Sequence, residues 1–367
     1  MIKVAIDTGP LTSGHSVRGI GVHTRLLIEH LEKLNGVKVE AVDFTKTDLS
    51  KFDVAHYQFF NPFFVNLPLI KKTKTVVTIH DLIPLIYPKH YPPGLKGKIK
   101  FNLNKFLVKR ADAVITISET SKKDIVRFLG IRPEKIHVVY LAPKPIYRKI
   151  GDQKTLNKAR EKYGLPDKFV LYVGDVNYNK NIPTLIKACE IADIPLVIAG
   201  KQAMDIETQG MGINDIKGLK DWFRFVLNKP HPELAHFKQI LKAFDKSKNI
   251  KRLGFVPDED LVAIYNLASI YCQPSYYEGY GIPVVDALTC GTPVVASRTQ
   301  ALVEIAGDGA YFADAKKPED FATKFKRIIE DKKLRNKYID SGREAVKKYS
   351  WQNTAQGTLA VYESLAK

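Results

Sequence analysis

Short apolar runs alternate with longer amphipathic segments along nearly the whole chain. Runs of about four to eight apolar residues are typical of strands, whereas apolar residues at every third or fourth position are typical of helices. Because most runs are apolar on both faces, we expect parallel sheets that helices cover on both sides. The predicted strands are Ile2–Asp7, Val37–Phe44, Val54–Gln58, Thr75–His80, Ala113–Ser118, Ile136–Leu141, Phe169–Val176, Pro195–Gly200, Lys251–Val256, Ser269–Gln273, Pro293–Ser297 and Ala310–Ala313.

The strands form two sets, which predicts an α/β protein with two Rossmann-like, doubly wound domains. A length of 367 residues agrees with this number, since one domain takes roughly 150 residues. We place the domains at residues 1–148 and 149–348, with a boundary at the prolines of Ala142–Pro145. Residues 202–249 are long for one connection and are interpreted as an insertion that contains a helix near Glu233–Phe244. Residues 349–367 are expected to form a final helix, capped by Ser350, that packs back on the first domain.

The amino-acid composition excludes several classes of protein. A hydrophobic fraction of 45% is enough to form cores and excludes a disordered chain. The 3 cysteines lie far apart without a CxxC pair, which excludes a disulfide scaffold and suits a reducing compartment. The longest apolar stretch, Phe59–Ile70, is too short to span a membrane, and the first residues do not resemble a signal peptide. We therefore expect a cytoplasmic protein.

Charge points to an anionic partner. Lys and Arg number 57 against 39 Asp and Glu, a net charge of +18, which favours nucleic acid, anionic lipid or a phosphorylated substrate. Residues 1–150 contain 25 basic and 12 acidic residues, whereas residues 151–367 contain 32 and 27. From Leu82 to Ala111 there are 7 basic residues and no acid, and one helical stripe there consists of Leu95, Ile99, Leu103 and Phe106. This segment is either an amphipathic helix on an anionic membrane surface or an ordinary helix whose stripe packs into the core.

The densest group of candidate functional residues is Pro274–Leu288. It follows a predicted strand and opens a helix near Gly281, where free backbone N–H groups attract phosphate. Glu278 is expected at the edge of a cleft and Asp286 lies two turns further on, so the two carboxylates suit the hydroxyls of a sugar and a ribose. The alternative is a turn glutamate that caps a helix, with Asp286 on a solvated face.

This segment resembles the signature of the family-4 retaining glycosyltransferases of GT-B fold, in which Pro-Ser-x-x precedes two carboxylates eight positions apart. The resemblance extends through Cys290–Ser297, Glu304, Gly307–Ala310, Leu253–Leu261 and Tyr349–Trp351. It implies two domains that face each other across a cleft, the first binding the acceptor and the second the nucleotide sugar. One departure is Asp286, because the family has a glutamate there.

The resemblance also implies roles for individual residues. Glu278 contacts the hydroxyls of the donor sugar, Asp286 grips the ribose, and Lys180 neutralises the pyrophosphate, although a solvated turn lysine is the alternative at that position. Many members carry an arginine where this chain has Asp175 or Asn179.

Gly19 and Gly21 match the family's glycine-rich loop, and His80 lies beside the reacting sugar, although a lone histidine is as often structural. The implied catalytic residues are His80, Glu278 and Lys180, and the implied donor-binding residues are Gly19, Gly21, Gly174, Asn179, Lys180, Val256, Glu278, Gly279, Tyr280, Gly281, Ile282 and Asp286.

The implied activity is retaining transfer of a hexose from a nucleotide-diphosphate sugar to a glycan or lipid-linked acceptor. Gly19–Thr24 and His80–Leu85 resemble mannosyltransferases, which favours GDP-mannose over a UDP-sugar. No cofactor or essential metal is expected, and Asp258–Asp260 is interpreted as a helix start rather than a metal-binding DxD.

Two alternatives are a GT-B epimerase that acts on the nucleotide sugar itself and a non-catalytic nucleic-acid binder. Only the positive charge suggests a nucleic-acid binder. Because the sequence contains no RNA-binding motif, we expect no nucleic-acid partner.

Overall fold

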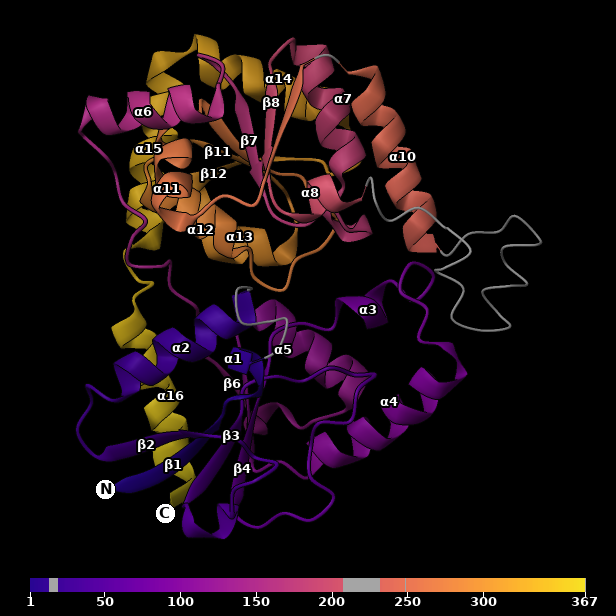
Figure 1. The fold of residues 1–367 in the computed structure, drawn as a ribbon, viewed down its shortest axis with the longest axis vertical. Helices are drawn as coiled ribbons and strands as arrows, with labels where there is room; N and C mark the ends of the chain where they lie inside the picture. The colour runs from indigo at the N-terminus through magenta and orange to yellow at the C-terminus, as the bar shows by residue number, and fades with distance from the viewer. Residues whose placement is uncertain (13–18, 207–231, 248, 367) are drawn as a thin grey trace. The chain divides into compact units, whose positions relative to one another are not determined.

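The computed structural model describes residues 1–12, 19–206, 232–247 and 249–366 (Figure 1). The chain divides into two compact units. The first unit consists of Met1–Pro88, Pro92–Pro143 and Lys348–Lys367, and the second of Lys89–Tyr91 and Lys144–Lys347. Each unit contains a six-stranded sheet in which all neighbouring strands are parallel, as the alternating pattern predicts.

The sheet of the first unit has the strand order β2-β1-β3-β4-β5-β6. Its central strands are buried along their whole length, because helices cover both faces and apolar side chains point both ways. All six predicted strands are confirmed, with ends that differ by at most a few residues. They are β1 (Ile2–Asp7), β2 (Val37–Val42), β3 (Val54–Tyr57), β4 (Lys74–Ile79), β5 (Ala113–Thr116) and β6 (Ile136–Val138).

Helices follow most of these strands. Ser118 caps α5 by accepting a hydrogen bond from the Ser121 amide. The helix α5 is followed by a π-helical turn at Ile125–Leu129, which Gly130 ends with a φ of 65°. The helices of this unit are α1 (Gly9–Thr12), α2 (Gly19–Leu31), α3 (Ile83–Ile86), α4 (Gly94–Lys109), α5 (Glu119–Asp124) and α16 (Trp351–Ala366), with short 3₁₀ turns at Leu49–Lys51 and Pro133–Lys135.

The last helix, α16, belongs to the first unit, and both chain ends lie there (Figure 1). Ser350 accepts a hydrogen bond from the Asn353 amide at 3.1 Å, which is the predicted cap. The Trp351 indole donates to the Pro143 carbonyl at 2.9 Å, and the Tyr362 hydroxyl lies 2.6 Å from His56 Nδ1. These contacts fix the end of the chain against the sheet of the first unit.

The second sheet has the order β12-β11-β10-β7-β8-β9. Its strand order reverses between β7 and β10, and ligands bind at such a switch point in open α/β sheets. The second set of predicted strands is also confirmed, as β7 (Val170–Val173), β8 (Leu196–Ala199), β9 (Ile250–Gly254), β10 (Ile270–Gln273), β11 (Val294–Ser297) and β12 (Ala310–Ala313).

The predicted insertion at residues 202–249 lies partly outside the described residues, which omit 207–231 and 248. Its described parts form α8 and α10, and the helix predicted at Glu233–Phe244 is confirmed within α10. The helices of the second unit are α6 (Gln153–Tyr163), α7 (Ile182–Ala192), α8 (Gln202–Asp205), α10 (Pro232–Lys246), α11 (Asp258–Leu267), α12 (Ile282–Thr289), α13 (Gln300–Ala306), α14 (Pro318–Glu330) and α15 (Lys332–Val346), with turns at Tyr178–Lys180 and Gly307–Gly309.

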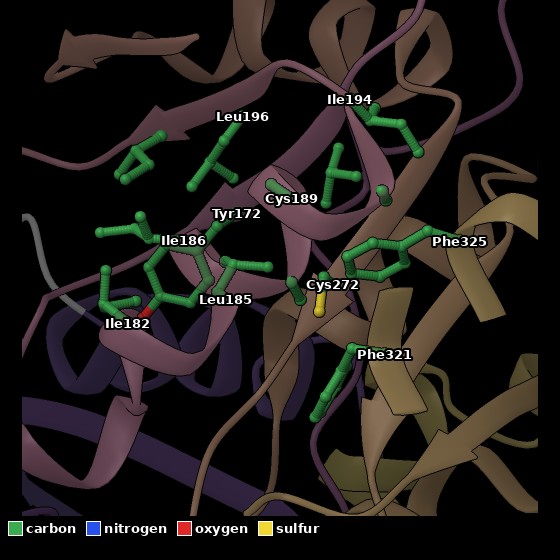
Figure 2. Packing of buried hydrophobic residues seen from close by; sticks show 14 of the residues in the cluster. Tyr172, Ile182, Leu185, Ile186, Cys189, Ile194, Leu196, Cys272, Phe321 and Phe325 are labelled. Atoms are coloured by element: carbon green, nitrogen blue, oxygen red, sulfur yellow. The ribbon is translucent and has the colours of Figure 1, made fainter. Parts of the chain in front are cut away.

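The core of the second unit packs α7, α10 and α14 on one face of the sheet. Figure 2 shows the part of this core that α7 and α14 form. Phe321 and Phe325 lie one turn apart on α14 and are fully buried with Cys272 of β10. Burying one such side chain contributes about 1.5–3 kcal/mol. Tyr271, the neighbour of Cys272, points to the opposite face and contacts Tyr265 of α11. The three cysteines, Cys189, Cys272 and Cys290, are buried and free.

Two features bear on the expectations about membranes. Among the residues that the structure describes, no helix has the length and apolar character needed to cross a bilayer. The stripe on α4 does not pack into the core, which contradicts the reading of an ordinary core-packed helix: Leu95, Ile99 and Phe106 are each more than half exposed. The buried residues of α4 are instead Gly97, Asn104, Leu107 and Val108.

Candidate active site

The ends of two adjacent strands bring Lys180 and Glu278 together. Lys180 lies in the turn after β7, and Glu278 lies five residues after β10. Because β7 and β10 are parallel neighbours, their carboxyl ends share one edge of the sheet, at the point where the strand order reverses. The sequence separates the two residues by 98 positions, and the topology makes them partners.

The Glu278 carboxylate lies at the centre of a buried polar network. Lys180 Nζ donates to both of its oxygens, at 2.8 Å and 2.9 Å. Oε1 also accepts from Gln273 Nε2 at 2.7 Å and from Ser275 Oγ at 2.5 Å. The side chain of Glu278 is 6% exposed and that of Lys180 is 23% exposed. Glu278 therefore does not cap a helix, and Lys180 is not a solvated turn lysine.

The loop after Glu278 leads into the N-terminus of α12. Gly281 has a φ of 112°, a conformation that favours glycine, and a Cβ there would lie 2.6 Å from Leu302 Cδ2. Ile282 begins the helix, and its N-cap residue, Gly281, offers no side-chain cap. Pro283 has no N–H, and the Val284 amide donates to the Gly281 carbonyl at 2.9 Å, so the positive end of the helix dipole is the main attraction for an anion here. Gly279 and Tyr280, the two residues after Glu278, are buried. Such a helix start attracts an anion next to the carboxylate network.

The loop after β7 is fixed to the loop after β10. The Tyr276 amide donates to the Asn179 carbonyl at 2.8 Å, and Asn179 Nδ2 donates to the Tyr277 carbonyl at 3.2 Å. Asn181 Nδ2 donates to the Pro274 carbonyl at 2.9 Å. These bonds hold Lys180, which lies between the two asparagines, beside Glu278.

Gly174 and Val256 follow β7 and β9 of the same sheet. Gly174 directly follows β7 with a φ of 140°, and a Cβ on its neighbour Gly200 would lie 2.2 Å from the Gly174 carbonyl oxygen. The two strand ends therefore approach too closely for a side chain at position 200. Val256 comes two residues after β9 and is buried.

Asp286 lies inside α12 and is buried, so the alternative of a solvated face is wrong. Burial raises the pKa of its carboxyl well above the usual value, Lys144 opposes this shift, and Asp258 adds to it. Lys144 Nζ instead donates to both oxygens of Asp258, at 2.7 Å. Oδ1 of Asp286 is a buried acceptor without a hydrogen-bond partner among the described residues. An unpaired acceptor of this kind fits a hydroxyl group that arrives with a ligand.

Asp258 and Asp260 open α11 but do not cap it, because the N-cap residue is Pro257. Asp260 accepts from Lys162 and from Tyr163, at 2.6 Å and 2.7 Å. Within the described ranges, no cluster of three His, Cys, Asp or Glu residues has the arrangement of a metal site.

The predicted residues of the first unit lie at the carboxyl end of its own sheet. His80 directly follows β4, and its Nε2 lies 3.0 Å from Nδ1 of His23 on α2. The His80 carbonyl accepts from Ser121 Oγ at 2.9 Å. Gly19 and Gly21 form the first turn of α2, where Gly19 is exposed and Gly21 is buried.

Two family models match the chain. Residues 154–345 match the model described as glycosyl transferases group 1, and residues 43–142 match the model described as glycosyltransferase family 4. The first match alone covers more than half of the chain. The chain belongs to the group 1 glycosyl transferases. The resemblance given by the Pro274–Leu288 segment is thus confirmed, and the alternative of a non-catalytic nucleic-acid binder is wrong.

Relatives of this glycosyltransferase agree with the family. The O-antigen chain mannosyltransferase B of Escherichia coli is 27% identical over 293 residues, which are 80% of this chain and 71% of that protein. The serotype-specific mannosyltransferase WbdA of the same organism is 25% identical over 77% of this chain, but the match spans only 32% of that longer protein. Among solved structures, the Anabaena protein HepE in complex with UDP-glucose is 16% identical and covers 100% of both chains with a TM-score of 0.69. This likeness supports the two-domain GT-B fold class.

Three residues of the glycosyltransferase site were not singled out from the sequence. Gln273 and Ser275 donate to Glu278, and Asn181 fixes the turn that carries Lys180. The available signal was that Gln273 and Ser275 are polar residues at or just after the end of an apolar strand, five and three residues before the candidate glutamate.

Proposed function

We propose that this glycosyltransferase transfers a hexose from a nucleotide-diphosphate sugar to a hydroxyl group of a glycan or lipid-linked acceptor, with retention of the anomeric configuration. The observation that carries the proposal is the buried Glu278–Lys180 ion pair at the switch point of the second sheet. Buried charges destabilise a fold unless they are well paired, and they concentrate at functional sites.

In this proposal the second unit binds the donor. Lys180 and the positive end of the α12 helix dipole face the diphosphate. Glu278 accepts hydrogen bonds from the sugar hydroxyls, and Asp286 accepts one from the ribose. The backbone of the surrounding loops lines the nucleotide, at Gly174, Asn179, Val256, Gly279, Tyr280, Gly281 and Ile282. In the first unit, Gly19 and Gly21 contribute backbone to the phosphates and His80 lies beside the reacting sugar.

The reaction needs no nucleophilic side chain. The bond between the anomeric carbon and the β-phosphate oxygen breaks, and the acceptor oxygen forms its bond to that carbon on the same face. The proton of the acceptor hydroxyl moves to the departing phosphate oxygen, so the products are the glycoside and the nucleoside diphosphate. Lys180 and the helix start stabilise the negative charge that develops on the leaving group.

GDP-mannose is the proposed donor. The two mannosyltransferases of Escherichia coli support the sugar, and their names point to polysaccharide biosynthesis as the setting. HepE was solved with UDP-glucose, which makes a UDP-sugar the competing donor. Calorimetric titration with GDP, UDP, ADP and their sugars decides this point, and equal affinity for GDP and UDP would reject GDP-mannose.

The proposed location is the cytoplasm, at the inner face of the membrane when the acceptor is lipid-linked. Transfer, rather than epimerisation, requires that the donor sugar appear on an added acceptor. Product formed from GDP-mannose without any acceptor would instead support an epimerase.

Glu278→Gln tests the central role. The amide keeps the shape of the side chain but removes its charge, so we expect transfer to fall by about 10³-fold with an unchanged circular dichroism spectrum. Turnover is measured as nucleoside diphosphate released from the donor with a mannoside acceptor. Glu259→Gln, an exposed glutamate of α11, is the matched control and should retain full activity. Equal activity in the two variants would remove Glu278 from the mechanism.

A further inference from the structure

The outward face of α4 is apolar. Leu95 is 70% exposed, Ile99 65%, Leu103 38% and Phe106 59%. Their spacing of three or four residues puts them in one stripe along the helix. The opposite face contacts the first unit through Gly97, Asn104, Leu107 and Val108, so packing within that unit does not use the stripe.

The segment before β4 enlarges this surface. Phe64 is 63% exposed, Val65 42%, Leu69 65% and Ile70 78%. Asn104 of α4 donates hydrogen bonds to the carbonyls of Asn61, Pro62 and Phe64, at 2.8–3.2 Å. Arg110 Nη1 donates to the Leu69 carbonyl at 2.8 Å, at the other end of the helix. We call this combined surface the α4 face; it consists of Leu95, Ile99, Leu103, Phe106, Phe64, Val65, Leu69 and Ile70.

Lysines flank the apolar stripe on both sides. A turn of about 100° per residue puts Lys96 and Lys100 on one side of it, and Lys98, Lys105 and Lys109 on the other. Lys100 Nζ lies 5.5 Å from the centre of the Phe64 ring, which places a cation at the edge of the α4 face. From Phe59 to Ala111 the sequence has 10 basic residues and a single acid, Asp81.

The combination of apolar and basic side chains on the α4 face indicates which kind of partner it binds. A second copy of the chain would bring two lysine-rich edges together, and nucleic acid would leave eight exposed apolar side chains in water. An anionic bilayer satisfies both parts, because acyl chains accept the apolar stripe while headgroup phosphates meet the flanking ammonium groups. A helix with this division lies in the plane of the interface rather than across it.

We propose that the α4 face docks the first unit on an anionic membrane surface, with Leu95, Ile99, Leu103 and Phe106 at the acyl boundary. The inference extends the proposed location to a specific surface. It does not depend on the proposed donor binding, because membrane binding can be measured without nucleotide. Failure of the membrane proposal would therefore leave the proposed transfer reaction unaffected.

Sedimentation of the full chain with phosphatidylcholine vesicles, with and without phosphatidylglycerol, tests the proposal. We expect at least about tenfold stronger binding to the anionic vesicles. Lys98→Gln/Lys105→Gln should weaken this binding by about fivefold for each lysine. Ile99→Gln/Phe106→Gln should weaken it by about tenfold or more, since both side chains enter the acyl boundary.

Matched controls come from the second unit. Lys332→Gln/Lys333→Gln removes two exposed lysines of α15, and Ile191→Gln/Val303→Gln removes two partly exposed apolar side chains, so both should bind as the wild type does. All substituted residues lie at the surface, and thermal unfolding checks that each variant is folded. Absence of vesicle binding by the wild type, equal binding to neutral vesicles, or equal losses in the controls would overturn the proposal. Binding that depends on the lysines but not on Ile99 and Phe106 would reject docking by the apolar stripe.

Discussion

The first unit buries neutral histidines in β3 and α2, whereas the second unit holds an ion pair in the loops after β7 and β10. In the first unit, His56 is buried between the hydroxyls of Tyr362 and Thr78, at 2.6 Å and 2.7 Å. Burial, and then the nearby His80, lower the pKa of His56 to about 3. The same causes, with a contribution from His56, lower the pKa of His23 well below its usual value. These two imidazoles are therefore neutral at pH 7.

The second unit instead buries an ion pair, because Glu278 holds Lys180 and accepts two further hydrogen bonds. A neutral cluster suits recognition of hydroxyl groups, whereas a paired cation next to a helix start suits a diphosphate. The difference teaches that sheets of the same architecture can carry different chemistry, because the imidazoles of the first unit lie in β3 and α2, whereas the charged pair of the second unit lies in the loops after β7 and β10. In the proposed function, the second unit therefore contributes the charged groups of the reaction.

Removing the cation from the second unit is expected to give the largest effect. Lys180→Met leaves the Glu278 carboxylate buried with only neutral donors, which should destabilise the second unit by about 2–3 kcal/mol, less than for a fully buried pair because Lys180 is partly exposed. The affinity for the nucleoside diphosphate should fall by about 10²-fold, because a charge-assisted contact is lost. Urea unfolding and calorimetry measure the two effects.

A double variant separates stability from function in this experiment. Lys180→Met/Glu278→Gln removes both charges and should recover most of the lost stability, but none of the affinity. If Lys180→Met binds the nucleotide as the wild type does, the ion pair is structural only, and the contrast between the units loses its functional meaning.

Acid should act on the first unit. His56 binds its proton in the unfolded chain near pH 6.5 but in the folded chain only near pH 3, so the unfolded state binds more protons between these values. Stability therefore falls as the pH falls below about 6.5, by about 2 kcal/mol at pH 5 from His56 alone. In a Trp222→Phe background, Trp351 is the remaining tryptophan and reports on the first unit, where its ring lies 6.0 Å from that of His23.

His56→Gln keeps a hydrogen-bonding side chain but cannot titrate. Its stability should be lower at pH 7 and should depend less on pH between 5 and 7 than that of the wild type. An unchanged pH dependence would mean that His56 does not control the acid sensitivity of the first unit.

Much of this architecture follows from the sequence, because strands apolar on both faces and separated by helices permit few arrangements. The period of two or 3.6 residues identifies each element. The period alone does not show which side of a helix is buried when apolar residues lie on two sides. On α4 the larger apolar side chains suggest the core-facing side, yet Gly97 permits close approach and Asn104 satisfies three carbonyls, so the opposite side is buried.

Prediction of the candidate active site has a similar limit, because the sequence does not show which distant residues become neighbours. Glu278 and Lys180 can be proposed from the strand ends that carry them, but the ion pair depends on β7 and β10 being neighbours, which the linear order does not reveal. Asp286 could be read as a ribose ligand or as a solvated acid. The residues that interact electrostatically with its carboxyl, Lys144, Tyr147 and Asp258, come from distant parts of the sequence.

Asp286 gives the smallest predicted effect and the sharpest test within the second unit. The pKa of its carboxyl is raised by folding, so the stability that it contributes is present at low pH and is lost as the pH rises through the folded value. This sign is opposite to that of His56. Asp286→Asn removes the titration, and we expect higher stability at pH 8 together with an affinity for nucleotide that falls by about tenfold, because an amide accepts a weaker hydrogen bond.

Two further variants make the Asp286 test decisive. Asp286→Glu restores the carboxylate and the residue that the family carries, so it should recover affinity, whereas Asp245→Asn on the exposed side of α10 should change neither quantity. Loss of stability in Asp286→Asn would show that the carboxylate is ionised and paired with Lys144. Unchanged affinity would show that this buried acid is structural, and that Glu278 with Lys180 alone distinguishes the second unit from the first.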